Sequence, residues 1–299
     1  MDTCGVCISP KEMHAQQLRD QFKLQILSTG SASGSAYVEL GQTKLQCTVR
    51  GPFPTTRGGY SDSCQIDCDL KYASFDKVNS SSAAPSGQQR DEKHLSSVLE
   101  SAIKPIVCVD KYPKTTISVN VLVLQSGSSS DCSSFSSELS ASIMACSAAL
   151  ASAGMQMYNL LSSVTITCVR GGVKSSGTAA RGGAGAQYEY FVHPNRSQLV
   201  DKTMVGSVTL AVAGTISGEV LGSDQPGGES VYEGSQSSFM TSQVYSQGRL
   251  PAPQLLEILQ LGGVLCSHVY HPVQKDCAIQ HALDTQSNVG DGSDTSSTA

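Results

Sequence analysis

Alternating apolar and polar positions predict that most of the chain is built from β-strands. The first two runs are joined by Gly41-Gln42, and a two-residue link containing glycine between alternating runs is typical of a tight hairpin. Other runs are continuously apolar and β-branched, which favours central strands. Strands are predicted at residues 35–40, 43–49, 63–72, 106–109, 115–125, 163–169, 187–192, 205–213, 215–221 and 237–245.

Three stretches show helical spacing instead. Asp91-Glu92 open the first, which carries Leu95 and Leu99 on one face and is stopped by Pro105. The second, over 134–153, is rich in alanine and serine, and such small residues allow close packing on a sheet, so we expect it to be buried. The third covers 253 to about 283. Runs of strands interrupted by a few helices predict an α+β fold.

Composition and charge narrow the possible functions. The 299 residues carry 20 Lys+Arg against 25 Asp+Glu, a net charge of −5, which excludes a globally basic coat for nucleic acid and restricts any RNA contact to local positions. Only 15% of the residues are charged, well below the usual quarter. A chain with so few charged residues is expected to bury part of its surface in contacts with partners.

Eleven cysteines, an odd number scattered along the chain, do not form the pattern of a secreted disulfide framework. The first residues lack the basic start and apolar stretch of a signal peptide, and no run approaches the ~20 apolar residues of a membrane span. These features predict a soluble intracellular protein with reduced thiols and no membrane partner.

Two sets of residues invite a metal interpretation that their spacing does not favour. Cys4 and Cys7 are a close pair, but Cys64 and Cys68 have the wrong spacing for a zinc knuckle and fit the inward face of a strand. His268 and His271 share a helix face without a third ligand.

The glycine-rich segment 170–185 lacks both nucleotide-binding fingerprints, so we expect a flexible hairpin loop. Its basic residues, Arg170, Lys174 and Arg181, are expected to be solvated rather than bound to phosphate.

Four ordered blocks carry a family resemblance. They are Gly34 to Pro52, closing in Val49-Arg50-Gly51-Pro52, then Tyr112 to Gln125, Ala141 to Tyr158, and Leu199 to Thr203. Together they resemble the RNase PH family, and in particular the branch that supplies the ring subunits of the eukaryotic RNA exosome, most of all the mRNA-transport-regulator type. The resemblance extends over roughly residues 18 to 283.

The resemblance implies one RNase PH-like domain (ribosomal protein S5 domain 2-like) over residues 17–285, with mixed sheets packed against helices. It would carry loop insertions near 77–90 and 223–237, between a flexible leader, 1–16, and a disordered tail, 286–299. The implied partners are other RNase PH-like subunits in a six-membered ring, cap subunits with RNA-binding domains, an associated nuclease and RNA. The implied location is the nucleus, including the nucleolus, and the cytoplasm.

The catalytic machinery of active relatives is not matched. Those enzymes cleave RNA with phosphate, which needs an anion site at a helix N-terminus and a pair of acids that hold Mg²⁺ or move a proton. The matching turn here is Ser137-Glu138-Leu139, with no arginine between Ser126 and Met155, and Asp201 has no second carboxylate before Glu219. We therefore expect no catalytic residues, metal or cofactor, and a structural subunit; an active phosphorolytic 3′ exoribonuclease and a stand-alone RNA-binding module are the alternatives.

Basic residues remain that the resemblance places at, or beside, positions facing the channel of the ring. They are Arg50, Arg57, Arg90, Lys93 and Lys114. Contacts from such residues to backbone phosphates would give affinity without sequence specificity. Ordinary exposed charge is an equally good interpretation of Lys93 and Lys114.

Overall fold

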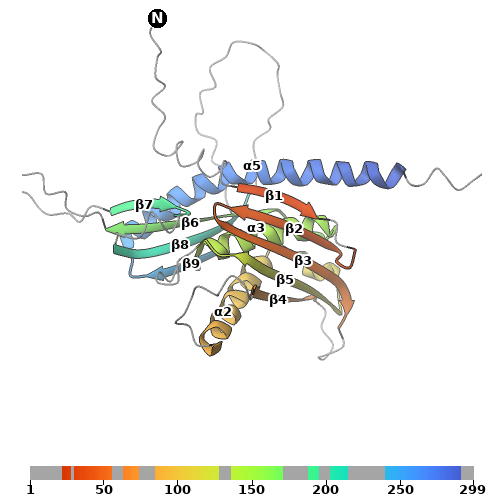
Figure 1. Ribbon diagram of the computed structural model, residues 1–299, viewed down its shortest axis with the longest axis horizontal. Coiled ribbons are helices and arrows are strands. Elements are labelled where there is room, and N and C mark those ends of the chain that lie inside the picture. Colours follow the sequence, from red (N-terminus) through yellow and green to blue (C-terminus); the bar gives the residue numbers. More distant parts are fainter. Residues whose placement is uncertain are drawn as a thin grey trace, which may run out of the picture.

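A computed structural model describes residues 22–27, 30–55, 63–73, 85–127, 136–170, 188–194, 203–214 and 240–290. The described chain folds into two β-sheets with helices between them and a long helix outside (Figure 1). The leader, Arg57, the glycine-rich segment 171–187, Asp201, the expected strand at 215–221 and the expected insertion at 223–237 lie outside these residues.

The first sheet has five strands in the order β1-β2-β3-β5-β4. All neighbours are antiparallel except β4 and β5, which run parallel. Its strands alternate between buried and open positions, so one face packs inward and the other is solvated. The strands are β1 (Phe22–Leu27), β2 (Gly34–Leu40), β3 (Thr43–Pro54), β4 (Gln65–Tyr72) and β5 (Thr115–Gln125).

The second sheet has four antiparallel strands in the order β7-β6-β8-β9. They are β6 (Leu161–Arg170), β7 (Tyr188–Val192), β8 (Thr203–Ala213) and β9 (Met240–Gly248). In contrast to the first sheet, β6 is buried at every position before Arg170. Helices cover both of its faces, which explains why its sequence does not alternate.

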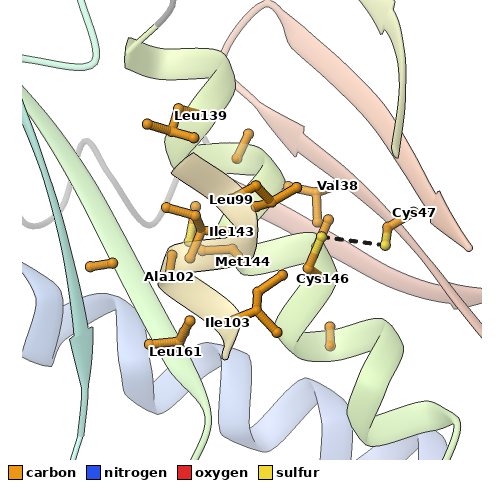
Figure 2. Close-up of a cluster of buried hydrophobic side chains, with 14 of the residues drawn as sticks. Val38, Cys47, Leu99, Ala102, Ile103, Leu139, Ile143, Met144, Cys146 and Leu161 are labelled. Atoms are coloured by element: carbon orange, nitrogen blue, oxygen red, sulfur yellow. Dashed lines mark hydrogen bonds between the residues drawn. The ribbon is translucent and has the colours of Figure 1, made fainter. Parts of the chain in front are cut away.

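Two helices fill the space between the sheets. They are α2 (Pro85–Ile103) and α3 (Ser136–Ser152), and a 3₁₀ turn, η2 (Val109–Lys111), precedes β5. Figure 2 shows the core that they form, in which Leu99 and Ile103 of α2 meet Ile143 and Met144 of α3. The Sγ atoms of Cys47 on β3 and Cys146 on α3 lie 3.6 Å apart in this core as free thiols.

The long helix α5 (Ala252–Gly290) crosses the outer face of the four-stranded sheet and continues past β1 (Figure 1). Gly262 lies at the crossing, where a Cβ would lie 2.9 Å from the end of the Leu210 side chain on β8. Further along α5, the Cys266 thiol donates to the Leu210 carbonyl at 3.8 Å. Among the described residues no helix, α5 included, combines the length and apolar character needed to cross a bilayer.

The α+β class and most of the predicted elements are confirmed, with four differences. Residues 106–109 were wrongly predicted as a strand, since they make only a single bridge between Val107 and Met157 before the 3₁₀ turn. The strand β1 was not predicted. Helix α2 begins at Pro85, inside the expected loop insertion, because proline is well placed in a first helical turn. Helix α5 extends to Gly290, five residues into the segment expected as tail.

Gly34 of β2 packs directly against the backbone at the end of α3, which leaves no room for a side chain. A Cβ at Gly34 of β2 would lie 2.4 Å from the Ala153 backbone nitrogen and 2.5 Å from the Ala149 carbonyl oxygen. Gly34→Ala should therefore lower the free energy of unfolding by about 1–3 kcal/mol, measured by urea denaturation. Gly30→Ala is the control, because a Cβ there meets nothing within 4 Å. Equal stability of the two variants would contradict this packing.

Candidate functional site

The N-terminal turn of α3 holds a buried carboxylate. Glu138 is 1% exposed and lies in the first turn, where free backbone N–H groups and the helix macrodipole favour negative charge. The hydroxyls of Tyr72, at the end of β4, and Ser126, directly after β5, donate hydrogen bonds to its two oxygens. The carboxylate thus joins β4, the segment after β5 and α3. Burial, with the charge of Glu138 beside it, raises the pKa of the Tyr72 phenol far above its usual range.

This geometry refines the interpretation of the turn Ser137-Glu138-Leu139. Glu138 stands at the helix N-terminus as the sequence predicts, but its side chain is engaged by internal hydroxyls rather than presented to solvent. Tyr72 and Ser126 were not identified from the sequence. They lie 66 and 12 residues away from Glu138, and no local pattern marks either as its partner.

Buried hydroxyl groups line the contact between α3 and the four-stranded sheet. The Ser140 hydroxyl donates to the Ser163 carbonyl at 2.9 Å, and the Ser163 hydroxyl donates to the Ser140 carbonyl at 2.8 Å. Farther along the same face, the hydroxyls of Thr165 on β6 and Thr209 on β8 are 3.0 Å apart. These polar groups satisfy one another inside the core, as buried hydroxyls must.

A buried histidine lies directly after β7, the edge strand of the same sheet. His193 follows β7 with a φ of 44°, and its backbone N–H donates to the Thr165 carbonyl at 3.0 Å. Its Nε2 accepts the Thr165 N–H at 3.4 Å, so the imidazole takes the place of the next backbone acceptor in the ladder. Nδ1 has no partner among the described residues. Burial lowers the pKa of His193 to about 3, so the ring is neutral at physiological pH.

The structure separates the predicted RNA-binding residues into two groups. Arg50 lies near the end of β3 and Lys114 directly before β5, and both are exposed. Arg90 and Lys93 are exposed on the first half of α2. The Leu70 N–H, near the end of β4, donates to the hydroxyl of Ser96, which is three residues after Lys93 on α2. The start of α2 therefore lies by the strand ends opposite Lys114. Their contact with RNA stays a prediction.

The cysteine pair of the first sheet occupies the inward strand face that its spacing predicts. Cys64 and Cys68 are buried free thiols, Cys68 on β4 and Cys64 directly before it. Burial raises the pKa of the Cys68 thiol above its usual range. His268 is half-buried on α5, while Cys4, Cys7 and the side chain of His271 lie outside the described residues.

Comparisons with known proteins agree with the two-sheet architecture and with the sequence blocks. The model of the 3′ exoribonuclease family, domain 1 (RNase PH), matches residues 21–156. The exosome complex component RRP41-like of Arabidopsis thaliana is 34% identical over 195 residues, covering 63% of this chain and 70% of that protein. The chain belongs to the RNase PH family.

Two further relatives match the chain over shorter spans. The exosome complex components MTR3 of mouse and human are 32% and 33% identical over 143 residues, which is 44% of this chain and about half of theirs, 49% and 48%. The crystal structure of rice Rrp46 covers 86% of this chain with a TM-score of 0.58 and 18% identity. That likeness confirms the RNase PH-like fold expected from the sequence.

Replacement of Glu138 tests whether its buried carboxylate stabilises the fold of this RNase PH-family chain. Glu138→Ala leaves the Tyr72 and Ser126 hydroxyls without their acceptor and should lower the free energy of unfolding by about 1–3 kcal/mol. Glu257→Ala is a matched control, since Glu257 also accepts a tyrosine hydroxyl, that of Tyr190 at 2.8 Å, but at an exposed site. Chemical denaturation should show a change within about 0.5 kcal/mol for the control. A Glu138→Ala variant as stable as the control would refute the role.

The buried His193 predicts a loss of stability in acid. The folded chain binds a proton there only near pH 3, while the unfolded chain does so below its ordinary pKa of 6.5. The free energy of unfolding should therefore fall by up to about 1.4 kcal/mol per pH unit as the pH drops from 6.5 toward 3. His193→Gln, which cannot take up this proton, should show a slope smaller by about one proton in urea titrations at pH 7, 6 and 5. An unchanged slope would rule out a neutral buried imidazole.

Proposed function

We propose that this chain is a non-catalytic structural subunit of the RNA exosome core ring, supporting 3′-to-5′ RNA processing and degradation. The observation that carries the non-catalytic part is the Glu138 carboxylate at the N-terminus of α3. Active members of the family would bind inorganic phosphate at this helix end. A helix N-terminus that already holds one buried anion is a poor site for a second.

A phosphate bound at this helix end would be repelled by the Glu138 carboxylate. Two like charges ~4 Å apart at an effective dielectric near 20 repel by about 4 kcal/mol. Moving Glu138 away would not remove this cost, because the Tyr72 and Ser126 hydroxyls would lose their acceptor. No arginine occurs between Ser126 and Met155 to offset the repulsion. Phosphate binding, and with it phosphorolysis, is therefore disfavoured at this helix end.

The exosome part of the proposal is supported by the names of the relatives. Proteins called exosome complex components RRP41-like and MTR3 match this chain at 34% and 32–33% identity. By analogy, the partners would be other RNase PH-like subunits in a six-membered ring, cap subunits with RNA-binding domains, an associated nuclease and RNA. The assembly would work in the nucleus, including the nucleolus, and in the cytoplasm.

In this role the chain acts by its shape and by its surface charge. It would hold neighbouring subunits, help to enclose the channel and guide RNA toward a nuclease bound elsewhere. The exposed cations Arg50, Arg90, Lys93 and Lys114 would contact backbone phosphates, which attract any RNA sequence alike. The 15% charged fraction is consistent with a surface largely covered by partners.

A phosphorolysis assay distinguishes the structural subunit from an active exoribonuclease. The full chain is incubated with RNA labelled at its 5′ end, inorganic phosphate and Mg²⁺, and we expect no nucleoside diphosphate and no shortened RNA. Release of nucleoside diphosphates would overturn the non-catalytic assignment.

Native mass spectrometry of the tagged chain, purified from its source, tests the assembly. We expect a complex with several related subunits. A monomer with RNA affinity would instead favour a stand-alone RNA-binding module.

A further inference from the structure

Two buried cysteines from distant parts of the chain meet where α3 packs on the first sheet. Cys47 lies on β3 and Cys146 on α3, 99 residues later in the sequence. Figure 2 shows the two side chains pointing toward one another, and their Sγ atoms are 3.6 Å apart. Both are free thiols, and neither has any exposed surface.

The backbone on each side of this thiol pair is held firmly by its neighbours. Cys47 is opposite Ala36 of β2 and Val121 of β5, so β3 is paired on both edges at this position. Cys146 lies in the middle of α3, where every residue from 138 to 150 is buried. Because neither backbone is free to move away, the fold keeps the two sulfurs in contact.

Two other thiols of the first sheet cannot replace either partner. Cys68 shares the inward face with Cys47, but β5 lies between their strands. Two strand spacings are about 9.5 Å, which exceeds the ~7 Å between Cα atoms that a disulfide can span. Cys64 lies directly before β4, and its thiol donates to the Gln65 carbonyl at 3.4 Å. The sulfurs of Cys47 and Cys146, in contrast, need to approach by only about 1.5 Å to reach a disulfide bond length.

Burial also protects the pair from most oxidants. Desolvation, together with the hydrogen bond from Cys47, raises the pKa of the Cys146 thiol well above its ordinary value. The thiolate is the nucleophile in thiol oxidation, so a raised pKa slows the reaction. A large charged reagent does not enter a closed core, whereas hydrogen peroxide is small and uncharged. The pair is therefore expected to stay reduced until peroxide is present.

We infer that Cys47 and Cys146 form a disulfide on oxidation by peroxide, which fastens α3 covalently to the first sheet. One sulfur attacks a peroxide oxygen, the O–O bond breaks, and a sulfenic acid and one water form. The second sulfur then displaces the sulfenic hydroxyl, which leaves with the remaining thiol proton as a second water. Two thiols are oxidised and one peroxide is reduced to two waters. The inference goes beyond the proposed function, since it depends only on the core.

Peptide mapping of the full chain tests the pairing. The reduced chain is treated with a small excess of hydrogen peroxide in native buffer, and the remaining thiols are blocked with N-ethylmaleimide. Trypsin and chymotrypsin together release Cys47 and Cys146 in peptides that contain no other cysteine. The cross-linked peptide pair should be at least tenfold more abundant than any other cross-link between cysteines of the described fold. The same treatment in concentrated urea should remove this preference, because the unfolded chain does not hold the two sulfurs together.

Urea denaturation of the oxidised and the reduced chain tests the covalent link. A disulfide that closes a loop of this length should raise the urea midpoint of the oxidised chain by on the order of 1 M. Cys68→Ala is the matched control, because it removes a buried thiol from the same sheet face and leaves the pair intact. It should keep the whole shift, whereas Cys47→Ala should show none.

Three results would overturn the disulfide. The first is a native sample without the cross-link between Cys47 and Cys146, a measurement that needs no variant to fold. The second is an equal preference for this pair in the native and the unfolded chain, which would show that the fold does not bring the sulfurs together. The third is a midpoint shift that persists in Cys47→Ala, which would assign the stabilisation to another pair of cysteines.

Discussion

The burial of α3 on all sides is the constraint on which the rest of the structure depends. From Glu138 to Leu150 each of its residues is buried, with the five-stranded sheet on one side and the four-stranded sheet on the other. Close approach requires small side chains, and alanines and serines provide them; at Gly34 the sheet itself has no side chain. The serines can be buried because each makes a hydrogen bond. The Ser140 and Ser142 hydroxyls donate to the backbone carbonyls of Ser163 and Glu138, and the Ser147 hydroxyl accepts the Leu161 N–H.

A helix that is buried along its length must also satisfy its first turn without water. Glu138 does this in part, because its carboxylate lies at the positive end of the helix macrodipole and is hydrogen-bonded by Tyr72 and Ser126. The negative charge that this helix end favours is thus supplied from inside the chain, by a carboxylate that two hydroxyls hold in place. The same residue therefore links the packing of the two sheets to the non-catalytic function that we propose.

The two sheets differ in how much of their surface is left for partners. In the four-stranded sheet β6 is covered on both faces, by α3 and by α5. The five-stranded sheet keeps an outer face on which Glu39 pairs with Lys44, and Lys71 with Asp69. At the strand ends, exposed cations lie on opposite sides, with Arg90 and Lys93 on one and Lys104, Lys111 and Lys114 on the other. A chain with a net negative charge thus still exposes cations at both ends of these strands, although acidic residues such as Asp91 and Glu92 lie beside them.

The sequence alone determined the α+β class, the extent of most strands and the buried character of α3, because period and composition are local properties. Its ordered blocks of family-like residues also indicated the family. It also placed Glu138 at a helix N-terminus. It missed β1, whose pairing with β2 is what defines it as a strand, and it misassigned 106–109, where an apolar β-branched run makes one bridge and then a 3₁₀ turn. Only the tertiary structure decided the partners of Glu138 and the burial of a neutral His193 ring whose Nδ1 has no partner among the described residues. Contacts between residues far apart in the chain have no local signature.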